Sequence, residues 1–412
     1  MVKTNGERLK ASLLSMAELG ATEAGGVTRL GLTDTDRAAR NRFSDWATAA
    51  GLKVRVDDLG IVYARLEGTE PTADPILIGS HLDSVPFGGK FDGTLGVMVG
   101  LEVARILAES GVCLRRPIEV VDFTSEEAGR FEPAMMASGV LAGRFTPEYV
   151  YSRADRDGCT YGAELERIGY KGSPANRVGK IHAYIEVHIE QGPALEAEGL
   201  PLGVGEGILG MIWKNVTVTG QPQHAGPSPM RSRRDAMVAA ARMISGIRDL
   251  ALDYPDPVTT TVGRVLPLPG VINQIPGQVI MSVDVRHWST AGLAELSERA
   301  EALMRRIAAE EKVDAQIEQI WRIDPTVFDP RLVDLVESET RRLGYPYCRL
   351  TSGAGHDAKY INEIAPTVML FVRTVGGKSH CETEAVHWDD VVAAADVLLS
   401  VVHTLAQEAP LR

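Results

Sequence analysis

The chain of 412 residues carries 55 acidic and 43 basic side chains, a formal charge of -12, and four cysteines without CxxC spacing. This length predicts two domains, and the acidic balance argues against a nucleic acid or an anionic membrane as partner. The scattered cysteines favour a reducing compartment. Residues 1–6 lack the apolar core of a signal peptide, and no apolar run is long enough to span a bilayer, so we expect a soluble cytoplasmic protein.

Helices and strands alternate over the first third of the chain. Apolar spacing and β-rich runs predict, in order, helices at 4–19 and 36–50, strands at 54–56, 61–66 and 76–78, a helix at 97–108 and a strand at 118–123. Thr33 and Asp36 are placed to form a capping box for the second helix. This alternation predicts an α/β domain with a mixed, largely parallel sheet. Such sheets place their chemistry at the carboxyl ends of the strands.

The strand that ends at Ile78 leads into Gly-Ser-His81-Leu-Asp83, and a glycine-rich turn then returns to Asp92. Imidazole and carboxylate groups are metal ligands, and a second carboxylate often orients a ligating histidine. A histidine beside an aspartate is also common as an ordinary hydrogen bond. These residues alone therefore leave both interpretations open.

Two adjacent glutamates, Glu126 and Glu127, follow the strand at 118–123. They are typical of a solvated turn. Adjacent side chains of extended backbone point to opposite sides, so one carboxylate could instead bind metal while the other acts as a base. The spacing does not say which of the two binds the metal.

A strand predicted at 181–189 has one apolar face and one face of ionisable and aromatic side chains. The polar face consists of His182, Tyr184, Glu186, His188 and Glu190. A polar outer strand explains this pattern. The alternative is that His188, near the end of the strand, is a metal ligand supported by its acidic neighbours.

The pattern changes after Met211. Strands at 213–219, 259–266, 279–286 and 313–323 and helices at 234–250 and 291–310 follow the split-βαβ, ferredoxin-like order. We therefore interpret residues 212–328 as an inserted second domain. Three of its residues are candidates for function, although each residue type is more often found at an ordinary surface: His224, Asn273 and Arg286.

The α/β pattern resumes with a helix at 330–343, a strand at 367–372 and a closing helix at 389–405. Two glycine-flanked loops in this part hold His356 and His380. Together the chain supplies five histidine and carboxylate groups at strand ends of one α/β unit: His81, Asp92, Glu127, His188 and His380. That is the donor set of two zinc-like ions that share a bridging carboxylate.

Over nearly its full length the chain resembles the M20 metallopeptidase-like amidohydrolases, and within them the N-carbamoyl-L-amino acid hydrolase branch with β-ureidopropionase and allantoate amidohydrolase. The matching motifs are Gly-Ser-His81-Leu-Asp83-Ser, Gly-Lys-Phe-Asp92-Gly, Ser-Glu126-Glu127, Glu186-Val-His188-Ile-Glu190-Gln191-Gly, His224-Ala-Gly, Asn273, Arg286, Gly-Ala-Gly355-His356-Asp-Ala and Ser-His380. Each motif is weak alone, but the ordered set is specific. Histidine at position 188, where peptidase relatives often have an acid, favours the carbamoylase branch.

The resemblance implies a metallo-aminopeptidase-like catalytic domain, residues 1–211 and 329–412, with the ferredoxin-like α+β segment 212–328 as a lid and dimerisation domain. It implies two divalent metal ions per subunit, Zn²⁺ first, with Mn²⁺, Co²⁺ or Ni²⁺ as alternatives. The implied ligands are His81, Asp92 and His188 for one ion and Asp92, Glu127 and His380 for the other. Glu126 would be the general base, and Asp83 would orient His81.

The resemblance also implies a homodimer in which His224 stabilises the oxyanion in the partner's active site. The implied groups for the carboxylate and ureido parts of the substrate are Gln191, Asn273, Arg286, Gly355 and His356. The expected reaction releases a free amino acid, CO2 and NH3. Phe87, where the family commonly has Asn, leaves the substrate's side-chain preference open.

Other functions stay open at this point. An allantoate amidohydrolase or β-ureidopropionase, or an aminoacylase or dipeptidase, would use the same scaffold, and a metal-stabilised binding protein would need no base. A serine or cysteine hydrolase is disfavoured, because the sequence has no Gly-x-Ser-x-Gly elbow and no cysteine with a histidine-paired signature.

Overall fold

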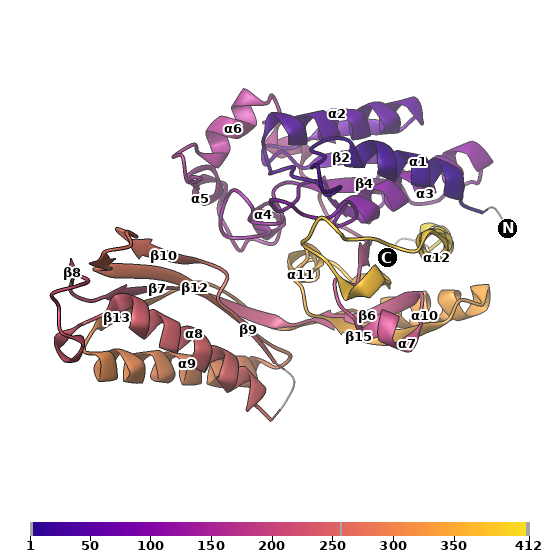
Figure 1. Ribbon diagram of the computed structural model, residues 1–412. Helices are drawn as coiled ribbons and strands as arrows, with labels where there is room; N and C mark the ends of the chain where they lie inside the picture. The colour runs from indigo at the N-terminus through magenta and orange to yellow at the C-terminus, as the bar shows by residue number, and fades with distance from the viewer. Residues whose placement is uncertain (1–2, 256–257, 409–412) are drawn as a thin grey trace. The chain divides into compact units, whose positions relative to one another are not determined.

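The computed structural model describes residues 3–255 and 258–408. The chain forms two compact units (Figure 1). Unit 1 is built from residues up to Gly207 and from Val327 onward, and unit 2 is Ile208–Thr326. Unit 2 thus begins at the last residue of β6 and ends at Thr326, a few residues before each bound of the segment 212–328 expected for the inserted domain.

The sheet of unit 1 is formed by β1 (Lys53–Val56), β2 (Val62–Leu66), β3 (Ile76–His81), β4 (Ile118–Phe123), β5 (Ala183–Ile189), β6 (Leu202–Ile208), β14 (Thr326–Val327), β15 (Tyr347–Ser352) and β16 (Thr367–Val372). The helices of this part of the chain are α1 (Gly6–Ala17), α2 (Asp34–Ala49), α3 (Thr94–Ser110), α4 (Met136–Leu141), α5 (Pro147–Tyr151), α6 (Tyr161–Arg167), α7 (Ala194–Glu198), α10 (Pro330–Leu343), α11 (Ala358–Ile361) and α12 (Trp388–Ala406).

The strand order in this nine-stranded sheet is β1-β2-β4-β3-β5-β16-β6-β14, with β15 beside β6. The four central strands β4, β3, β5 and β16 run parallel to one another, and β1, β2 and β6 pair antiparallel. Helix α3 packs on β3, β4 and β5, and α12 packs on β5, β16 and α3. The mixed, largely parallel sheet predicted from the alternation is therefore confirmed.

Strand β5 is a central strand, and all of its residues are buried. Its polar face is thus enclosed within unit 1, and the interpretation as a polar outer strand is wrong. The reason is that β3 and β16 flank β5 on its two sides, with elements packed over both faces. Polar groups in such a position need partners of their own, since water cannot supply them.

Local sequence signals place the helix ends well. The side chain of Thr33 accepts a hydrogen bond from the backbone N–H of Asp36, 3.3 Å away, at the start of α2. The reciprocal bond of the expected capping box differs: the Asp36 carboxylate accepts the N–H of Leu32 at 2.8 Å rather than that of Thr33. The helix ends before Gly51, whose φ of 83° suits glycine.

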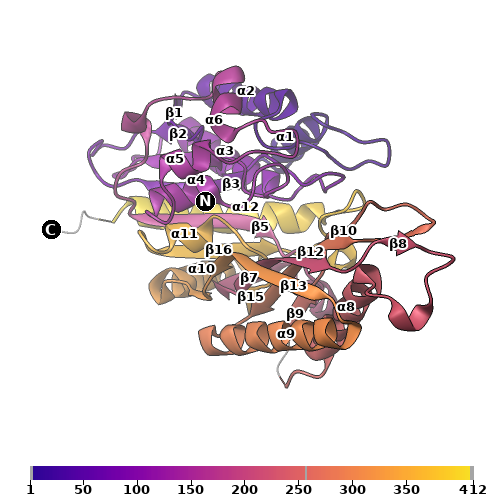
Figure 2. The ribbon, with the colours of Figure 1, turned by 90° about the vertical axis from the view of Figure 1, so that its left-hand side faces the viewer.

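Unit 2 contains β7 (Gly210–Thr219), β8 (Gln223–His224), α8 (Ala236–Leu252), β9 (Thr259–Thr261), β10 (Val265–Leu268), β11 (Gln274–Ile275), β12 (Gln278–His287), α9 (Thr290–Glu311) and β13 (Asp314–Ile323). Its sheet has the order β10-β12-β7-β13, the ferredoxin-like arrangement, with β9 also paired to β12. The strand expected at 259–266 is divided into β9 and β10. Alternate residues of β7 and β12 form a core with α8 and α9, which lie on one face of this sheet (Figure 2).

Candidate metal centre

The predicted ligands gather where the parallel strands of unit 1 end. His81 is the last residue of β3, the glutamate pair follows β4, His188 is close to the end of β5, and His380 lies in the loop after β16. Because these four strands are parallel neighbours, their carboxyl ends meet along one edge of the sheet. Asp92 joins them from the turn before α3.

Asp92 occupies the middle of this group. Its Oδ1 lies 3.3 Å from His188 Nε2, and its Oδ2 lies 3.2 Å from His380 Nε2. The amide nitrogen of Gln191 donates to the same Oδ2 at 2.8 Å. His380 Nε2 is also 3.3 Å from Glu127 Oε2. The two oxygens of Asp92 thus face two different sets of donors.

Two groups of three side chains have donor atoms within 4.8 Å of one another: His81, Asp92 and His188, and Asp92, Glu127 and His380. These are the two ligand sets that the family resemblance implies. A third group within the same distance, which the sequence did not suggest, is Glu186, His188 and His356. Imidazole nitrogens and carboxylate oxygens at this spacing suit a zinc-like divalent ion.

The charge in the cluster also fits a cation. Burial lowers the pKa of His81, but the carboxylates of Asp83, Glu127 and Asp92 outweigh it and raise the pKa to about 9. The Glu127 carboxylate, with Asp92, raises the pKa of His380 to about 11 against the effect of burial. In addition, Glu127 Oε1 is buried without a hydrogen-bond partner among the described residues. Hydrogen-bond acceptors thus outnumber donors in this cluster, which suits the binding of a cation.

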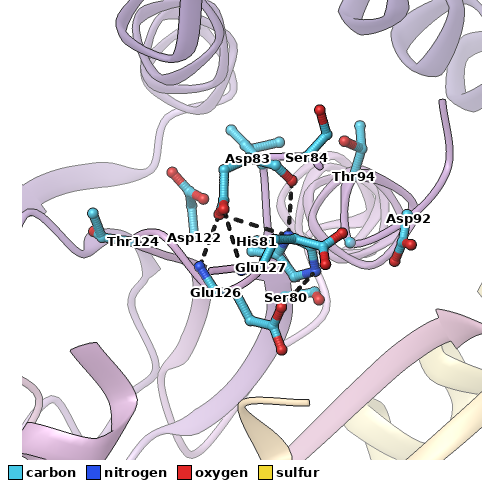
Figure 3. A network of polar contacts seen from close by, with 12 residues as sticks. Ser80, His81, Asp83, Ser84, Asp92, Thr94, Asp122, Thr124, Glu126 and Glu127 are labelled. Atoms are coloured by element: carbon cyan, nitrogen blue, oxygen red, sulfur yellow. Dashed lines mark hydrogen bonds and ion pairs between the residues drawn. The ribbon is translucent and has the colours of Figure 1, made fainter. Parts of the chain in front are cut away.

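Asp83 connects the strand ends that carry His81 and the glutamate pair (Figure 3). Its carboxylate accepts the backbone N–H of Glu126 at 3.0 Å and that of Glu127 at 3.3 Å. Its main-chain carbonyl oxygen is 3.0 Å from His81 Nδ1, whereas its carboxylate oxygen is 3.7 Å away. Asp83 therefore contacts the His81 ring mainly through its backbone.

Glu126 belongs to neither ligand group, although it lies next to one of the ligands. Its Oε2 is 3.7 Å from His81 Nε2, and the side chain is buried. Burial and the neighbouring Glu127 raise the pKa of Glu126 well above its ordinary value. Such a carboxylate takes up a proton near neutral pH more readily than an exposed one.

Three of the residues expected to bind substrate belong to unit 1, and two of them, Gln191 and His356, contact this cluster. Gln191 has a φ of 58°, which turns its amide toward Asp92 and His380. The His356 ring packs against that of His188 with centroids 4.4 Å apart, and its Nε2 lies 2.9 Å from Ser352 Oγ. Gly355 precedes His356 in the loop between β15 and α11.

The other three candidates belong to unit 2 and lie at different places in it. His224 is in β8 and pairs with Gln274 of β11, and the Ala225 N–H donates to the Asn273 carbonyl at 2.9 Å. His224 and Asn273 are therefore neighbours. Arg286 lies near the far end of β12, where its guanidinium forms an ion pair of 2.6 Å with Asp284.

Sequence reasoning missed two buried residues that hold this site together. Arg29, with a 1% exposed side chain, donates to the main-chain oxygen of Leu82 and to Thr94 Oγ1, which flank His81 and Asp92 in the chain. Glu384 accepts the backbone N–H of Asp92 at 3.2 Å. An arginine or glutamate without a motif has no signal in the sequence, although Glu384 follows His380 by only one helical turn's spacing.

Comparisons with known proteins show the family of this chain. Residues 77–404 match the model of peptidase family M20/M25/M40. The N-carbamoyl-L-amino-acid amidohydrolase of Rhizobium meliloti is 42% identical over 405 residues, covering 98% of this chain and 97% of that protein. The corresponding enzyme of Geobacillus stearothermophilus is 39% identical and covers 98% of this chain and 99% of its own length.

An allantoate amidohydrolase of Bacillus subtilis is 33% identical, covering 95% of this chain and 95% of that protein. A solved amidase of the hydantoinase/carbamoylase family from Burkholderia vietnamiensis is 45% identical, with a TM-score of 0.96, over 100% of this chain and 99% of that one. The family model, the full-length relatives and the donor set at the strand ends lead to one conclusion. This chain belongs to peptidase family M20/M25/M40.

Proposed function

We propose that this protein is a metal-dependent amidohydrolase that cleaves N-carbamoyl-L-amino acids to the free amino acid, CO2 and NH3. The observation that carries the proposal is the cluster, buried except around Glu127 and His380, in which two three-residue donor sets share Asp92 beside an unshared glutamate. The names of the relatives at 42% and 39% identity supply the substrate class.

In this proposal the cluster binds two divalent ions, Zn²⁺ first, with Mn²⁺, Co²⁺ or Ni²⁺ as alternatives. His81 and His188 would hold one ion and Glu127 and His380 the other, with Asp92 shared by both sets. The contacts of Asp92 support this, since its Oδ1 faces His188 and its Oδ2 faces His380. Bound divalent ions lower the pKa of water toward neutrality and polarise a carbonyl group.

Glu126 would be the general base. Its carboxylate takes a proton from the attacking water and delivers it to the nitrogen of the amino acid as the C–N bond breaks. The carbamic acid formed at the same time decomposes to CO2 and NH3, so one water is consumed for each substrate. Asp83 supports this step, because its hydrogen bonds to the backbone N–H groups of Glu126 and Glu127 hold the main chain from which both carboxylates extend.

Arg286 would bind the substrate carboxylate through its planar guanidinium, which matches a carboxylate by two parallel hydrogen bonds. Gln191, His356 and Gly355 would contact the ureido group from the metal side. In the structure Arg286 is paired with Asp284, so a substrate carboxylate would share or replace that partner.

Unit 2 gives a reason to expect a homodimer. In the ladder between β7 and β12, Gln278 pairs with Thr219 and Arg286 with Met211. Strand β8 with His224 follows Thr219, at the opposite end of the sheet from Arg286. Eight residues of β12 separate the two ends, roughly 26 Å of extended chain. A small N-carbamoyl amino acid cannot reach both ends of one unit 2.

We therefore propose that His224 and Asn273 of one subunit act in the active site of its partner, where His224 stabilises the negative charge that develops on the carbonyl oxygen. The edge strand β10 and the loop after it expose apolar side chains that a second copy would cover: Val265, Leu266, Leu268, Val271 and Ile272. In this proposal unit 1 is the catalytic domain and unit 2 the lid and dimerisation domain.

We also propose a cytoplasmic location. All four cysteines are free in the structure, which suits a reducing compartment. Among the described residues, none of the helices has the combination of length and apolar character needed to cross a membrane. Neither a nucleic acid nor a membrane is a partner in this proposal.

A matched pair of adjacent substitutions tests the proposed division of labour. Glu126→Gln keeps the shape of the side chain but removes the base, so release of amino acid from N-carbamoyl-L-amino acids falls by at least about 100-fold while two metal ions stay bound. Glu127→Gln instead weakens metal binding. Turnover assays and metal analysis of both proteins are the measurements. Wild-type turnover by Glu126→Gln would overturn the assignment.

The second candidate is an allantoate amidohydrolase, favoured by the relative of 33% identity, and N-carbamoyl-β-alanine is a related alternative substrate. A panel of N-carbamoyl-L-amino acids, N-carbamoyl-β-alanine, allantoate and N-acetyl amino acids separates these possibilities. We expect the highest kcat/KM with N-carbamoyl-L-amino acids. Faster turnover of an N-acetyl amino acid would instead point to an aminoacylase.

A further inference from the structure

Glu384 is a buried carboxylate with no part in the mechanism above, yet it contacts both loops that bring Asp92 and His380 together. Its side chain is 3% exposed. Its Oε1 accepts the backbone N–H of Phe91 at 2.9 Å and that of Asp92 at 3.2 Å. Its Oε2 lies 3.0 Å from the hydroxyl of Ser379, the residue before His380.

The Ser379 hydroxyl extends this contact to the shared ligand itself. Its oxygen is also 3.0 Å from Asp92 Oδ2, the carboxylate oxygen that faces His380. Glu384 therefore reaches Asp92 twice, through the backbone N–H and through the Ser379 hydroxyl. A single side chain links two loops whose contact residues, Asp92 and Glu384, are 292 positions apart in the chain.

Gly89, in the turn before Asp92, makes room for this carboxylate. A Cβ placed on Gly89 would lie 1.9 Å from the carboxyl carbon and from Oε1 of Glu384. No side chain can occupy that position unless Glu384 moves. The loop backbone thus closes directly over Glu384, which explains a glycine at position 89 by packing rather than by backbone conformation.

We propose that Glu384 is a positioning residue that sets the distance between Asp92 and His380 and so prepares the site for its metal ions. This inference rests on one part of the proposed function, that Asp92 and His380 bind metal, and does not depend on which substrate is hydrolysed. In the part of the chain that the structure describes, no β-ladder joins the loops of Asp92 and His380. Without Glu384, both the backbone N–H of Asp92 and the Ser379 hydroxyl therefore lose a fixed partner. Outer contacts of this kind commonly change metal affinity by about 10- to 100-fold.

Three variants of Glu384 test the proposal, with Zn²⁺ affinity of the chelator-stripped protein measured by competition with a chromophoric chelator. Glu384→Ala removes both contacts, and we expect at least one Zn²⁺ to bind about 10- to 100-fold more weakly. Glu384→Gln should keep most of the affinity, because its amide oxygen still accepts both N–H groups and its NH2 donates to Ser379. Glu384→Asp should behave like Ala, because its shorter side chain cannot reach both loops.

Gly89→Ala provides a second route to the same result, because it displaces the carboxylate while Glu384 stays in the sequence. Glu102→Gln is the control. Glu102 is also a buried glutamate, but its partners are Arg8 and the N–H of Asn5, away from the ligands. We expect this control to change the melting temperature and to leave Zn²⁺ affinity unchanged. Melting temperatures of all variants, measured without metal, separate loss of folding from loss of affinity.

Activity adds a readout that separates positioning from catalysis. At limiting Zn²⁺ we expect kcat of Glu384→Ala to fall with little change in KM, and excess Zn²⁺ to restore part of it. Wild-type Zn²⁺ affinity in Glu384→Ala would overturn the inference and leave the proposed function intact. A wild-type protein that binds two Zn²⁺ ions but hydrolyses no N-carbamoyl compound would overturn the function and leave the inference standing.

Discussion

The pKa values of buried carboxylates in this protein are shifted in opposite directions, depending on the charges that surround each one. Asp92 is buried, which raises its pKa, but His380 and His188 hold the pKa well below its usual range. Burial raises the pKa of Asp83 to about 6 although His81 lowers it, and burial together with the charge of Asp92 raises the pKa of Glu384 to about 8. The shared ligand is thus the carboxylate that stays charged in the absence of a metal, as a first binding point for a cation requires.

Asp57 is a buried carboxylate outside the metal centre, so its effect on the free energy of unfolding can be measured separately from metal binding. Its oxygens accept the N–H groups of Leu59 and Ile61 and the hydroxyl of Tyr63, but burial still raises its pKa to about 6. Since the unfolded value is about 3.9, the folded state binds the proton more tightly. The stability contributed by Asp57 is therefore complete below about pH 4 and is lost as the pH rises to about 6.

Asp57→Asn removes this titration. Relative to the variant, the wild-type free energy of unfolding should fall by about 2 kcal/mol between pH 4 and 7, as urea titrations at each pH would show. Asp58→Asn is the neighbouring control. Arg177 and Tyr151 lower the pKa of Asp58 despite its burial, so its stabilisation is present at high pH and lost as the pH falls. Parallel slopes for the two variants would contradict the assignment.

At the scale of elements, α3 is the helix that connects the ligands to the sheet. It packs on β3, β4 and β5, which carry or precede His81, the glutamate pair and His188. It begins directly after Asp92 and Gly93. The N–H of Gly93 lies 3.2 Å from His188 Nε2, so the first turn of the helix forms one wall of the cluster.

The two ends of α3 offer a matched comparison of glycines. Gly93 and Gly111 have similar φ angles, 62° and 64°, but only Gly111, with a ψ of 16°, lies in the left-handed region, where alanine adds backbone strain of about 1 kcal/mol. Gly93, with a ψ of -50°, lies outside that region, so alanine is strained further there. A Cβ on Gly93 would lie 2.3 Å from Cε1 of His81, whereas a Cβ on Gly111 would meet nothing within 4 Å. We expect Gly111→Ala to lower stability slightly and to keep Zn²⁺ affinity. Gly93→Ala should lose Zn²⁺ binding, as a chelator competition assay would detect; equal affinities would contradict this account.

At the scale of the whole molecule, the separation of His224 and Arg286 in unit 2, together with the proposed dimer, predicts that two inactive variants restore activity when they form a mixed dimer. Neither His224→Ala nor Arg286→Ala should support turnover alone. In a mixed dimer, however, one of the two sites combines the intact His224 of one chain with the intact Arg286 of the other.

Mixing the two variants in equal amounts under conditions of subunit exchange should restore about a quarter of the wild-type activity, because half of the dimers are mixed and each has one intact site. Two differently tagged chains, purified through both tags, would raise this to half. If each site uses both residues from one chain, every site in the mixed dimer stays damaged and no activity returns. That outcome would contradict the two-subunit site.

The sequence by itself determined the kinds of donor in this protein and the strands that carry them. Hydrophobic periodicity predicted β4, α10 and β16 because these elements follow from local spacing alone, and chain order then placed His81, Glu127 and His380 at the ends of parallel neighbours. The sequence did not predict β6, β15 and α4, because three glycines interrupt β6, β15 has no apolar run, and α4 has only six residues.

Only the tertiary structure decided which glutamate joins His380. The argument from extended backbone could not, because Ser125 and Ala128 on either side of the pair have φ angles of 55° and 53° and turn the chain. The hydrogen bond between the Asp92 N–H and Glu384, and the separation of His224 from Arg286, could not be predicted from the sequence either. Both depend on which segments lie side by side in the fold, and local spacing carries no information about contacts between residues far apart in the chain.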